Sequence, residues 1–419
     1  MPGITEAQWN MEVFSKMSKL RLLKINNVQL SEGPQDLSNM LRFLEWHFYP
    51  SKSLPSFLQV DELVELHMPN SSIEQLWYGY KKAINMVIID LSNSLNLVRT
   101  PDFTGIPNIK RLLSMNNCKK LTRIPEGISC LKLLKKLDLS GCSRLKYIPE
   151  NFGEAGSLEE FDLSGTSIEQ LPASISLLKN LKVLSLDGCK RIDVLPSLSG
   201  LCSLEVLGLR ACHLKERELP EDIGGLSSLM SLDLSGNDFV SLPRSINKLS
   251  RLEMLVLEDC RMLESLPEVP SKVHTVNLNG CIRLRKIPDP KMLSSSKRLE
   301  FSCLNCWELY WHNGEDSMGF TMLASYLQDL SNPRPGFGII VPGNEIAVHL
   351  VKILLFFVIS RKMEEKIILR QWVLVVTLSK FCQIIFGYSI YLLITLKSLN
   401  NGSMNRLATL SCRFIPPSK

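Results

Sequence analysis

The 419-residue sequence lacks several features that mark common classes of protein. Its N-terminus, Met1 to Glu6, has neither the basic nor the apolar segment of a secretory signal peptide, so we expect a reducing compartment. The 12 cysteines are therefore expected to be free thiols and not a disulfide framework. The sequence contains no Gly-Lys dipeptide, which excludes a Gly-x-x-x-x-Gly-Lys-Ser/Thr phosphate-binding loop within it.

Catalytic and metal-binding patterns are equally scarce. The six histidines are scattered, and none lies in a His-x-x-x-His frame. Cys303-x-x-Cys306 has the spacing of half a zinc site or of a redox pair, but no second Cys-x-x-Cys or histidine pair accompanies it. We interpret both as packing thiols, and predict a protein that is not an enzyme and that binds no cofactor or metal.

Charge is distributed unevenly along the chain. The formal net charge is +6, yet residues 348–419 hold 10 basic and only 2 acidic residues. The first 347 residues therefore hold 38 basic and 40 acidic residues, a net charge of −2. The basic character belongs to the tail and does not indicate a nucleic-acid-binding protein.

An internal repeat governs most of the sequence. Its clearest copy is Leu134-x-x-Leu137-x-Leu139-x-x-Cys142-x-x-Leu145, closed by Ile148-Pro149. We call the third apolar residue of each copy the anchor. The anchors lie 21 to 25 residues apart: Ile25, Trp46, Met68, Leu91, Met115, Leu139, Leu163, Leu186, Leu209, Leu234, Leu257 and Leu278. These twelve units of about 23 residues have the period of leucine-rich repeats.

The spacing predicts the fold. Alternation in x-Leu-x-Leu-x places the leucines on one face of a short strand and the x residues on the other. Stacked units would form a parallel sheet over a continuous leucine core, and the Leu/Ile-Pro step leaves room for only a turn or two of helix on the opposite side. The predicted fold class is α/β: a leucine-rich-repeat solenoid, or horseshoe, with a parallel concave sheet. Six cysteines lie three residues after an anchor, where a small buried side chain would fill the turn.

The predicted concave face carries acidic residues. The residue before each anchor projects from this face, and Asp90, Asp138, Asp162 and Asp233 occur there, with Glu65 and Glu160 two positions upstream. We predict a surface for a protein partner with a basic patch, and no nucleic-acid binding. The alternative is that aspartate simply keeps an exposed face soluble. The full set of predicted partner-binding residues is Glu65, Asp90, Asp138, Glu160, Asp162, Ser185, Arg210, Asp233 and Asn277.

The repeat stops after Ile287-Pro288, and the tail changes character. Residues 372–396 are a stretch of 25 with Lys380 as its only charge, close to the ~20 apolar residues that a spanning helix needs. Three interpretations stay open: a transmembrane helix, a buried β-rich core, and an aberrant C-terminus such as read-through of a non-coding segment, which we favour. Residues 1–19 are assigned to an N-terminal linker or cap and residues 20–290 to the repeats.

Specific strings resemble a known family. Glu12 to Ile25, Leu41 to His47, Leu63 to Trp77 and Thr100 to Asn108 resemble the repeat region of plant intracellular TIR-NB-LRR disease-resistance proteins, such as the receptor for tobacco mosaic virus. Ile340 to Ile346 resembles the start of the jelly-roll or Ig-like domain that follows these repeats, which gives residues 291–347 to an incomplete β-rich domain and 348–419 to a hydrophobic, basic tail. The family's TIR and NB-ARC modules are absent from this sequence.

The resemblance implies a function. A repeat module of this family would sense a pathogen effector or a host protein in the defence response, in the cytoplasm or nucleus, without catalysis. The alternative is a membrane-tethered leucine-rich-repeat receptor or scaffold, anchored by residues 372–396.

Overall fold

The computed structural model describes residues 5–7, 9–10, 12–215, 218–288, 300–306 and 308–309, together with strands at 337–341, 374–377, 390–396 and 408–414. The chain divides into two compact units, Met1–Leu229 and Met230–Lys419.

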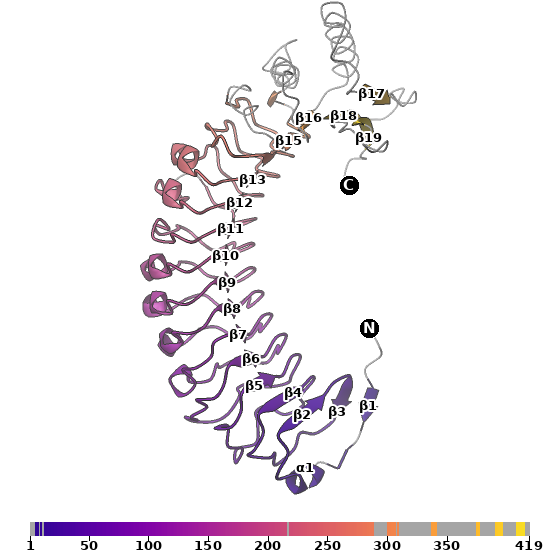
Figure 1. The fold of residues 1–419 in the computed structure, drawn as a ribbon, viewed down its shortest axis with the longest axis vertical. Coiled ribbons are helices and arrows are strands. Elements are labelled where there is room, and N and C mark those ends of the chain that lie inside the picture. Colours follow the sequence, from indigo (N-terminus) through magenta and orange to yellow (C-terminus); the bar gives the residue numbers. More distant parts are fainter. Residues whose placement is uncertain are drawn as a thin grey trace, which may run out of the picture. The chain divides into compact units, whose positions relative to one another are not determined.

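The first unit is a parallel stack of one short strand per repeat (Figure 1). It begins with β1 (Thr5–Ala7), which pairs with β3 (Val28–Leu30), and with helix α1 (Glu12–Lys16). Each later strand pairs in parallel with the strand of the next repeat. These strands are β2 (Leu22–Ile25), β4 (Phe43–Trp46), β5 (Glu65–His67), β6 (Ile88–Asp90), β7 (Leu112–Ser114), β8 (Lys136–Asp138), β9 (Glu160–Asp162), β10 (Val183–Ser185) and β11 (Val206–Gly208).

The second unit continues the same construction. Its parallel strands are β12 (Ser231–Asp233), β13 (Met254–Val256), β14 (Thr275–Asn277), β15 (Glu300–Ser302) and β16 (Phe337–Val341). Strand β18 (Ile390–Leu396) pairs antiparallel with β16 and with β19 (Ala408–Phe414), and β19 pairs in parallel with β17 (Leu374–Thr377). The predicted leucine-rich-repeat solenoid is confirmed: about twelve turns, with few helices.

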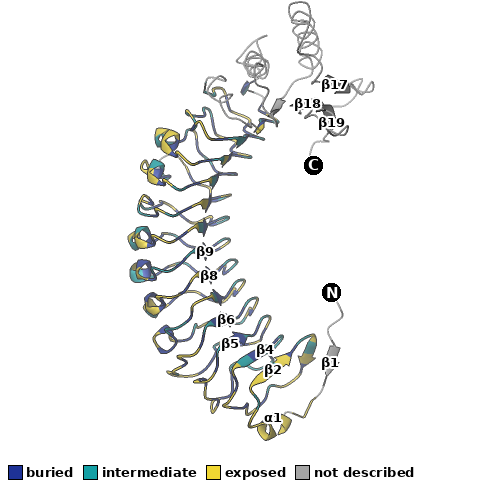
Figure 2. Ribbon diagram, in the orientation of Figure 1, coloured by how far each residue is buried: buried dark blue, intermediate teal, exposed yellow. Residues whose placement is uncertain are grey.

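The anchors explain why the strands are where they are. From β5 to β14 each strand occupies the three residues before an anchor, so its middle residue is the second leucine of the motif. Leu66, Leu137 and Leu232 are middle residues, and all are fully buried while the residues on either side are not. This period-two burial forms the leucine core that Figure 2 shows along the inside of the stack.

One further strand extends the repeat beyond the predicted end of the leucine pattern. Strand β15 pairs with β14 in the repeat register, with Phe301 opposite Val276. Phe301 is buried in the leucine position, and Cys303 and Cys306 are buried in the anchor and turn positions. The leucine pattern does not reveal this turn, because Phe301 and Cys303 occupy two positions that are usually leucine.

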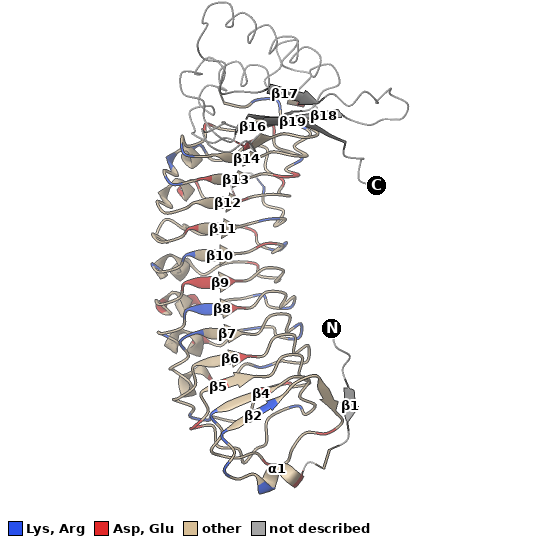
Figure 3. Cartoon of the chain, turned by 45° about the vertical axis from the view of Figure 1, so that its right-hand side comes forward, with Lys and Arg blue, Asp and Glu red and all other residues tan. Residues whose placement is uncertain are grey.

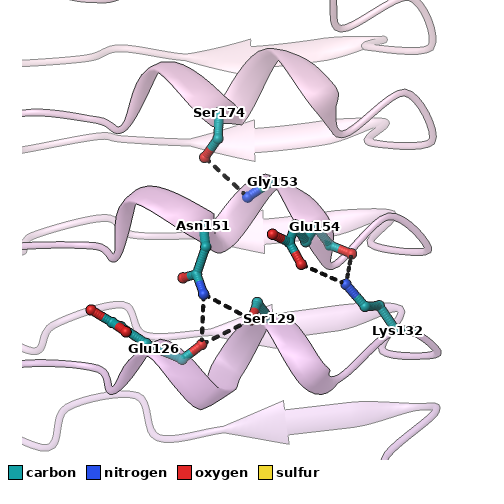
Figure 4. A network of polar contacts seen from close by, with 7 residues as sticks. All are labelled: Glu126, Ser129, Lys132, Asn151, Gly153, Glu154 and Ser174. Carbon is teal, nitrogen blue, oxygen red and sulfur yellow. Dashed lines mark hydrogen bonds and ion pairs between the residues drawn. The ribbon is translucent and has the colours of Figure 1, made fainter.

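Short 3₁₀ helices form the side of the first unit opposite the strands (Figure 1). They are η1 (Phe103–Gly105), η2 (Glu126–Cys130), η3 (Glu150–Glu154), η4 (Ala173–Leu177) and η5 (Ile223–Gly225), and the second unit adds η6 (Arg244–Lys248). Polar contacts join successive helices: Asn151 Nδ2 donates to Ser129 Oγ at 3.0 Å, and Lys132 Nζ lies 3.0 Å from Glu154 Oε2 (Figure 4). The prolines before η2, η3, η4 and η6 limit each to the predicted turn or two.

A left-handed residue ends the turn after each strand. The second residue after the anchor has φ between 53° and 79° in every repeat, and this position is mostly Asn or Gly, as at Asn93 and Gly165. These residue types tolerate positive φ best. Phe48, Ala211 and Asp259 occupy the same position with less suitable side chains.

Much of the predicted C-terminal organisation falls outside the described residues. This applies to residues 289–299, to most of 310–347, and to the tail apart from β17, β18 and β19. Within the candidate spanning segment, 372–396, the described residues form β17 and β18. No helix in the part of the chain that the structure describes is long and apolar enough to cross a membrane.

Candidate binding surface on the parallel strands

Eight of the nine predicted partner-binding residues lie on the exposed side of the strands, as the period-two pattern requires, and Arg210 lies in the turn after β11. Seven of them are half-buried, whereas Glu160 and Arg210 are exposed. In each unit we call the outward-facing residues of the strands the strand face, which comprises β4 to β11 in the first unit and β12 to β14 in the second. Glu65 and Glu160 begin their strands, while Asp90, Asp138, Asp162, Ser185, Asp233 and Asn277 end theirs.

The aspartates at the strand ends have a structural role that the sequence reasoning did not identify. Oδ1 of Asp138 accepts a hydrogen bond from the backbone N–H of Ser140 at 3.0 Å, and Asp162 does the same for Ser164 at 2.9 Å. Asp90, Asp233 and Asn277 make the equivalent bond two residues ahead, at 2.9, 2.9 and 3.0 Å. Each forms an Asx turn, and this turn supports the left-handed residue that lies three positions further along the chain.

Repeats without this aspartate use other bonds. Ser185 Oγ lies 2.6 Å from Ser164 Oγ on the preceding turn, and the backbone N–H of Arg210 donates to Asp187 Oδ1 at 2.8 Å. Arg210 is therefore held through its main chain, in a repeat whose strand ends in a buried glycine, Gly208.

Strands β8 and β9 bring the densest group of charges together. In their register, Asp138 lies opposite Asp162 and Lys136 lies opposite Glu160. Lys136 Nζ is 2.6 Å from Glu160 Oε2, and this hydrogen bond raises the pKa of Lys136. Figure 3 shows basic β8 beside acidic β9. Three carboxylates thus share one ammonium group, so the group has a net negative charge.

A second polar group lies at the N-terminal end, and of its residues only Glu65 was predicted from the sequence. Glu45 on β4 lies 2.8 Å from Lys24 Nζ and 3.4 Å from His47 Nε2. Burial acts to raise the pKa of Glu45, but hydrogen bonds from Lys24 and Asn26 outweigh it and hold the pKa below its usual value. On β5, Glu65 and His67 are 3.2 Å apart. The sequence does mark this group: in two successive repeats a glutamate is followed two residues later by a histidine.

The cysteines behave as the turn-filling residues predicted for them. The Sγ atoms of Cys118, Cys142, Cys189, Cys212, Cys260 and Cys281 each lie 3.0 to 3.4 Å from the carbonyl oxygen of the anchor one repeat earlier. Cys306 makes the same bond to Leu278 at 3.1 Å, which supports its interpretation as a packing thiol. We call these seven the cysteine column.

Burial makes the cysteine column chemically inert. It raises the pKa of the Cys142, Cys212 and Cys260 thiols to about 12, so the nucleophilic thiolate is scarce near neutral pH. Within the described residues, no group of three or more His, Cys, Asp or Glu side chains could hold a metal ion.

Comparison with known proteins shows what the repeats are similar to. Leucine Rich Repeat models match residues 62–81, 133–155 and 228–249. The disease resistance protein RPV1 of Vitis rotundifolia is 35% identical over 131 residues, covering 25% of this chain and 9% of that protein. The disease resistance protein RML1B of Arabidopsis thaliana is 36% identical over 119 residues, covering 27% of this chain and 12% of the relative. About a quarter of this chain is therefore similar to a part of plant TIR-NB-LRR disease resistance proteins.

The resemblance to this family that the sequence strings indicated is thus confirmed. The chain spans only about a tenth of the length of these relatives. Among solved structures, a leucine-rich-repeat protein of Leptospira interrogans aligns with a TM-score of 0.54 and 23% identity, covering 72% of this chain and 84% of that one. That likeness concerns the fold alone.

Proposed function

We propose that the repeats are a non-enzymatic protein-recognition module of plant defence. The strand face would bind a basic patch on a pathogen effector or on a host protein, in the cytoplasm or nucleus. The leucine-rich-repeat fold and the homology to disease resistance proteins support a protein-interaction role in immunity.

The charges of β8 and β9 carry the proposal. Asp138 and Asp162 lie directly opposite each other on adjacent strands, and like charges in this arrangement destabilise a sheet. Lys136 pairs with Glu160, and Asp138 Oδ2 accepts a hydrogen bond from the neutral Asn116 amide at 2.9 Å. A lysine or arginine from a partner would relieve this repulsion, which favours a basic surface through selectivity and association rate.

The Asx turns determine how the proposal is tested. Replacing Asp138 or Asp162 by arginine would remove the turn acceptor as well as the charge, so lost binding would have two explanations. Asparagine retains Oδ1 and removes only the charge, as Asn277 demonstrates in this chain. The test variant is therefore Asp138→Asn with Glu160→Gln and Asp162→Asn.

The measurement is co-precipitation of candidate effectors and host proteins with the 419-residue chain. Glu126→Gln with Glu150→Gln and Glu154→Gln is the control, because it removes three charges from the 3₁₀ helices on the opposite side of the unit. We expect the strand-face variant to lose a partner that the control retains. A partner retained equally by both variants would overturn the assignment of binding to β8 and β9.

A further inference from the structure

A flank of the first unit carries positive charge that neither the fold nor the proposed strand face uses. In three successive turns, residues 94–100, 118–124 and 142–148 contain six basic residues and no acidic residue. We call the six the basic flank: Arg99, Lys119, Lys120, Arg123, Arg144 and Lys146. All are exposed except Lys146, which is half-buried.

Contacts between turns show that these residues lie side by side. The backbones of Arg123 and Tyr147 form a parallel bridge, so equivalent positions of the second and third turns are neighbours. Lys120 Nζ donates to Asn96 Oδ1 at 2.8 Å, which joins the first and second turns. The six cationic groups therefore share one surface that is three turns long.

The positive charge of the basic flank is almost uncompensated. Among the described residues, only Lys146 of the six has an ion pair, with Glu169 at 3.4 Å. Glu169 belongs to the next turn, where it also lies 3.9 Å from Arg191. The other five cations have no carboxylate of the described residues within ion-pair distance. By contrast, Lys135 and Lys182, which precede β8 and β10, lie 2.7 and 2.8 Å from Glu159.

Acidic residues limit the width of the surface. On the side of the 3₁₀ helices, Asp102, Glu126 and Glu150 follow the prolines that end the three turns, and all are exposed. On the side of the strands lie Asp90 and Asp138. A broad polyanion, such as a membrane or a nucleic-acid duplex, would meet these carboxylates and be repelled, whereas a narrow acidic chain would touch only the cations.

Apolar side chains are interspersed with the cations. Leu95, Val98 and Tyr147 are 50%, 42% and 58% exposed, and belong to the same turns. Such a mixture suits a peptide that alternates acidic and apolar residues better than it suits a bare phosphate chain. Neighbouring strands are ~4.8 Å apart, so with side-chain reach the flank spans ~15 Å, the length of about five extended residues.

We propose that the basic flank binds an extended acidic segment of a partner protein, about five residues long, with apolar residues among the carboxylates. This site is separate from the strand face and does not depend on its proposed function. Two surfaces of opposite charge on one unit would allow two different partners, or two parts of one partner, to be engaged together.

The test uses the 419-residue chain and fluorescence anisotropy. The probe is a fluorescein-labelled twelve-residue peptide made of three Asp-Glu-Val-Glu units, and the neutral probe has Asn-Gln-Val-Gln units. Arg123→Glu with Arg144→Glu is the test variant, since neither side chain has a polar contact with another described residue to lose. Lys110→Glu with Lys179→Glu is the control, because both are exposed, make the same charge change and lie off the flank. Thermal unfolding verifies that all three proteins are folded.

We expect the acidic probe to bind and the neutral probe not to bind, with affinity falling as salt rises. The test variant should weaken binding about tenfold or more, and the control variant less than about twofold. Absence of binding by the acidic probe, or equal binding by both variants, would overturn the proposal. A twelve-residue oligothymidylate or phosphatidylserine vesicles that bind more tightly than the peptide, with the same loss in the test variant, would also overturn it and assign the flank to nucleic acid or lipid.

Discussion

Substitutions of Asp162 distinguish the two roles of the strand-end carboxylates, which accept the hydrogen bond of the turn and also carry negative charge. Asp162 Oδ1 accepts from the Ser164 backbone N–H at 2.9 Å, and the side chain is half-buried. A hydrogen bond to a charged group contributes ~1.5–3 kcal/mol when fully buried. Because water can reach this turn and replace part of the bond, we expect Asp162→Ala to lower the free energy of unfolding by about 1 kcal/mol. At ~2.1 cal/mol/K of unfolding entropy per residue, that corresponds to a fall of about 1 °C in Tm for this chain.

Asp162→Asn should behave differently. The asparagine Oδ1 keeps the turn bond, and loss of the charge relieves repulsion from Asp138 across the strands. Cross-strand charge pairs are worth ~0.2–1 kcal/mol, so this variant should be as stable as the wild type or slightly more stable. Urea and thermal unfolding followed by circular dichroism give the order: asparagine at or above wild type, and alanine below it.

An independent site tests the same reasoning in the second unit. Asn277→Ala removes the equivalent bond, from Oδ1 to the Asn279 N–H at 3.0 Å, without any change of charge. It should lower Tm as much as Asp162→Ala does. If Asp162→Asn is as damaging as Asp162→Ala, the charge and not the acceptor matters, and the Asx-turn explanation is refuted.

Three further predictions concern backbone strain, acid stability and thiol reactivity. Ala211→Gly should raise the free energy of unfolding by about 0.5–1 kcal/mol, seen as a higher urea midpoint, because Ala211 has φ 53° and glycine adopts positive φ without the ~1–2 kcal/mol cost. Hydrogen bonds from lysines on the two neighbouring turns lower the pKa of Glu159 from 4.5 to about 2, so its stabilising contribution is complete above pH 4.5 and lost as pH falls towards 2. Lys182→Met should therefore lose less stability than wild type between pH 4.5 and 2 in acid unfolding curves. Iodoacetamide at pH 7.5 should modify only Cys130 and Cys202 among the ten described cysteines, as read by peptide mass spectrometry, since these two alone are exposed.

The strands and the cysteine column could be predicted from the sequence because buried positions repeat. Leu137 and Cys142 recur in type from turn to turn, since each turn offers the same volume to the side chain. The turn containing Phe301 and Cys306 escaped prediction for the same reason, because these side chains fill the volume without matching the leucine pattern. A sequence pattern records residue types, while packing responds to size and polarity.

The strand face was predicted in position but not in physical role. Alternation fixed which residues face outward, including Asp138, Glu160 and Asp162. The bonds that Asp138 and Asp162 make to the backbone depend on the left-handed turn that follows, and no periodicity reveals the path of that turn. Its signal was the recurring Asp-Leu-Ser, with Asn or Gly next, which we interpreted as surface charge only.

The difference between a structural and a binding role determines how strongly each charged surface indicates a partner. Aspartate ends β6, β8, β9 and β12 because the turn uses it, so its recurrence alone says little about a partner. What points to binding on the strand face is local: Asp138 opposite Asp162, with a single lysine nearby. The basic flank is local in the same sense, because the repeat requires no cation at Arg123 or Arg144. The next turn has an acidic residue, Glu169, beside the flank. A cluster that the repeat does not require is free to have another role, and recognition of an acidic segment is such a role.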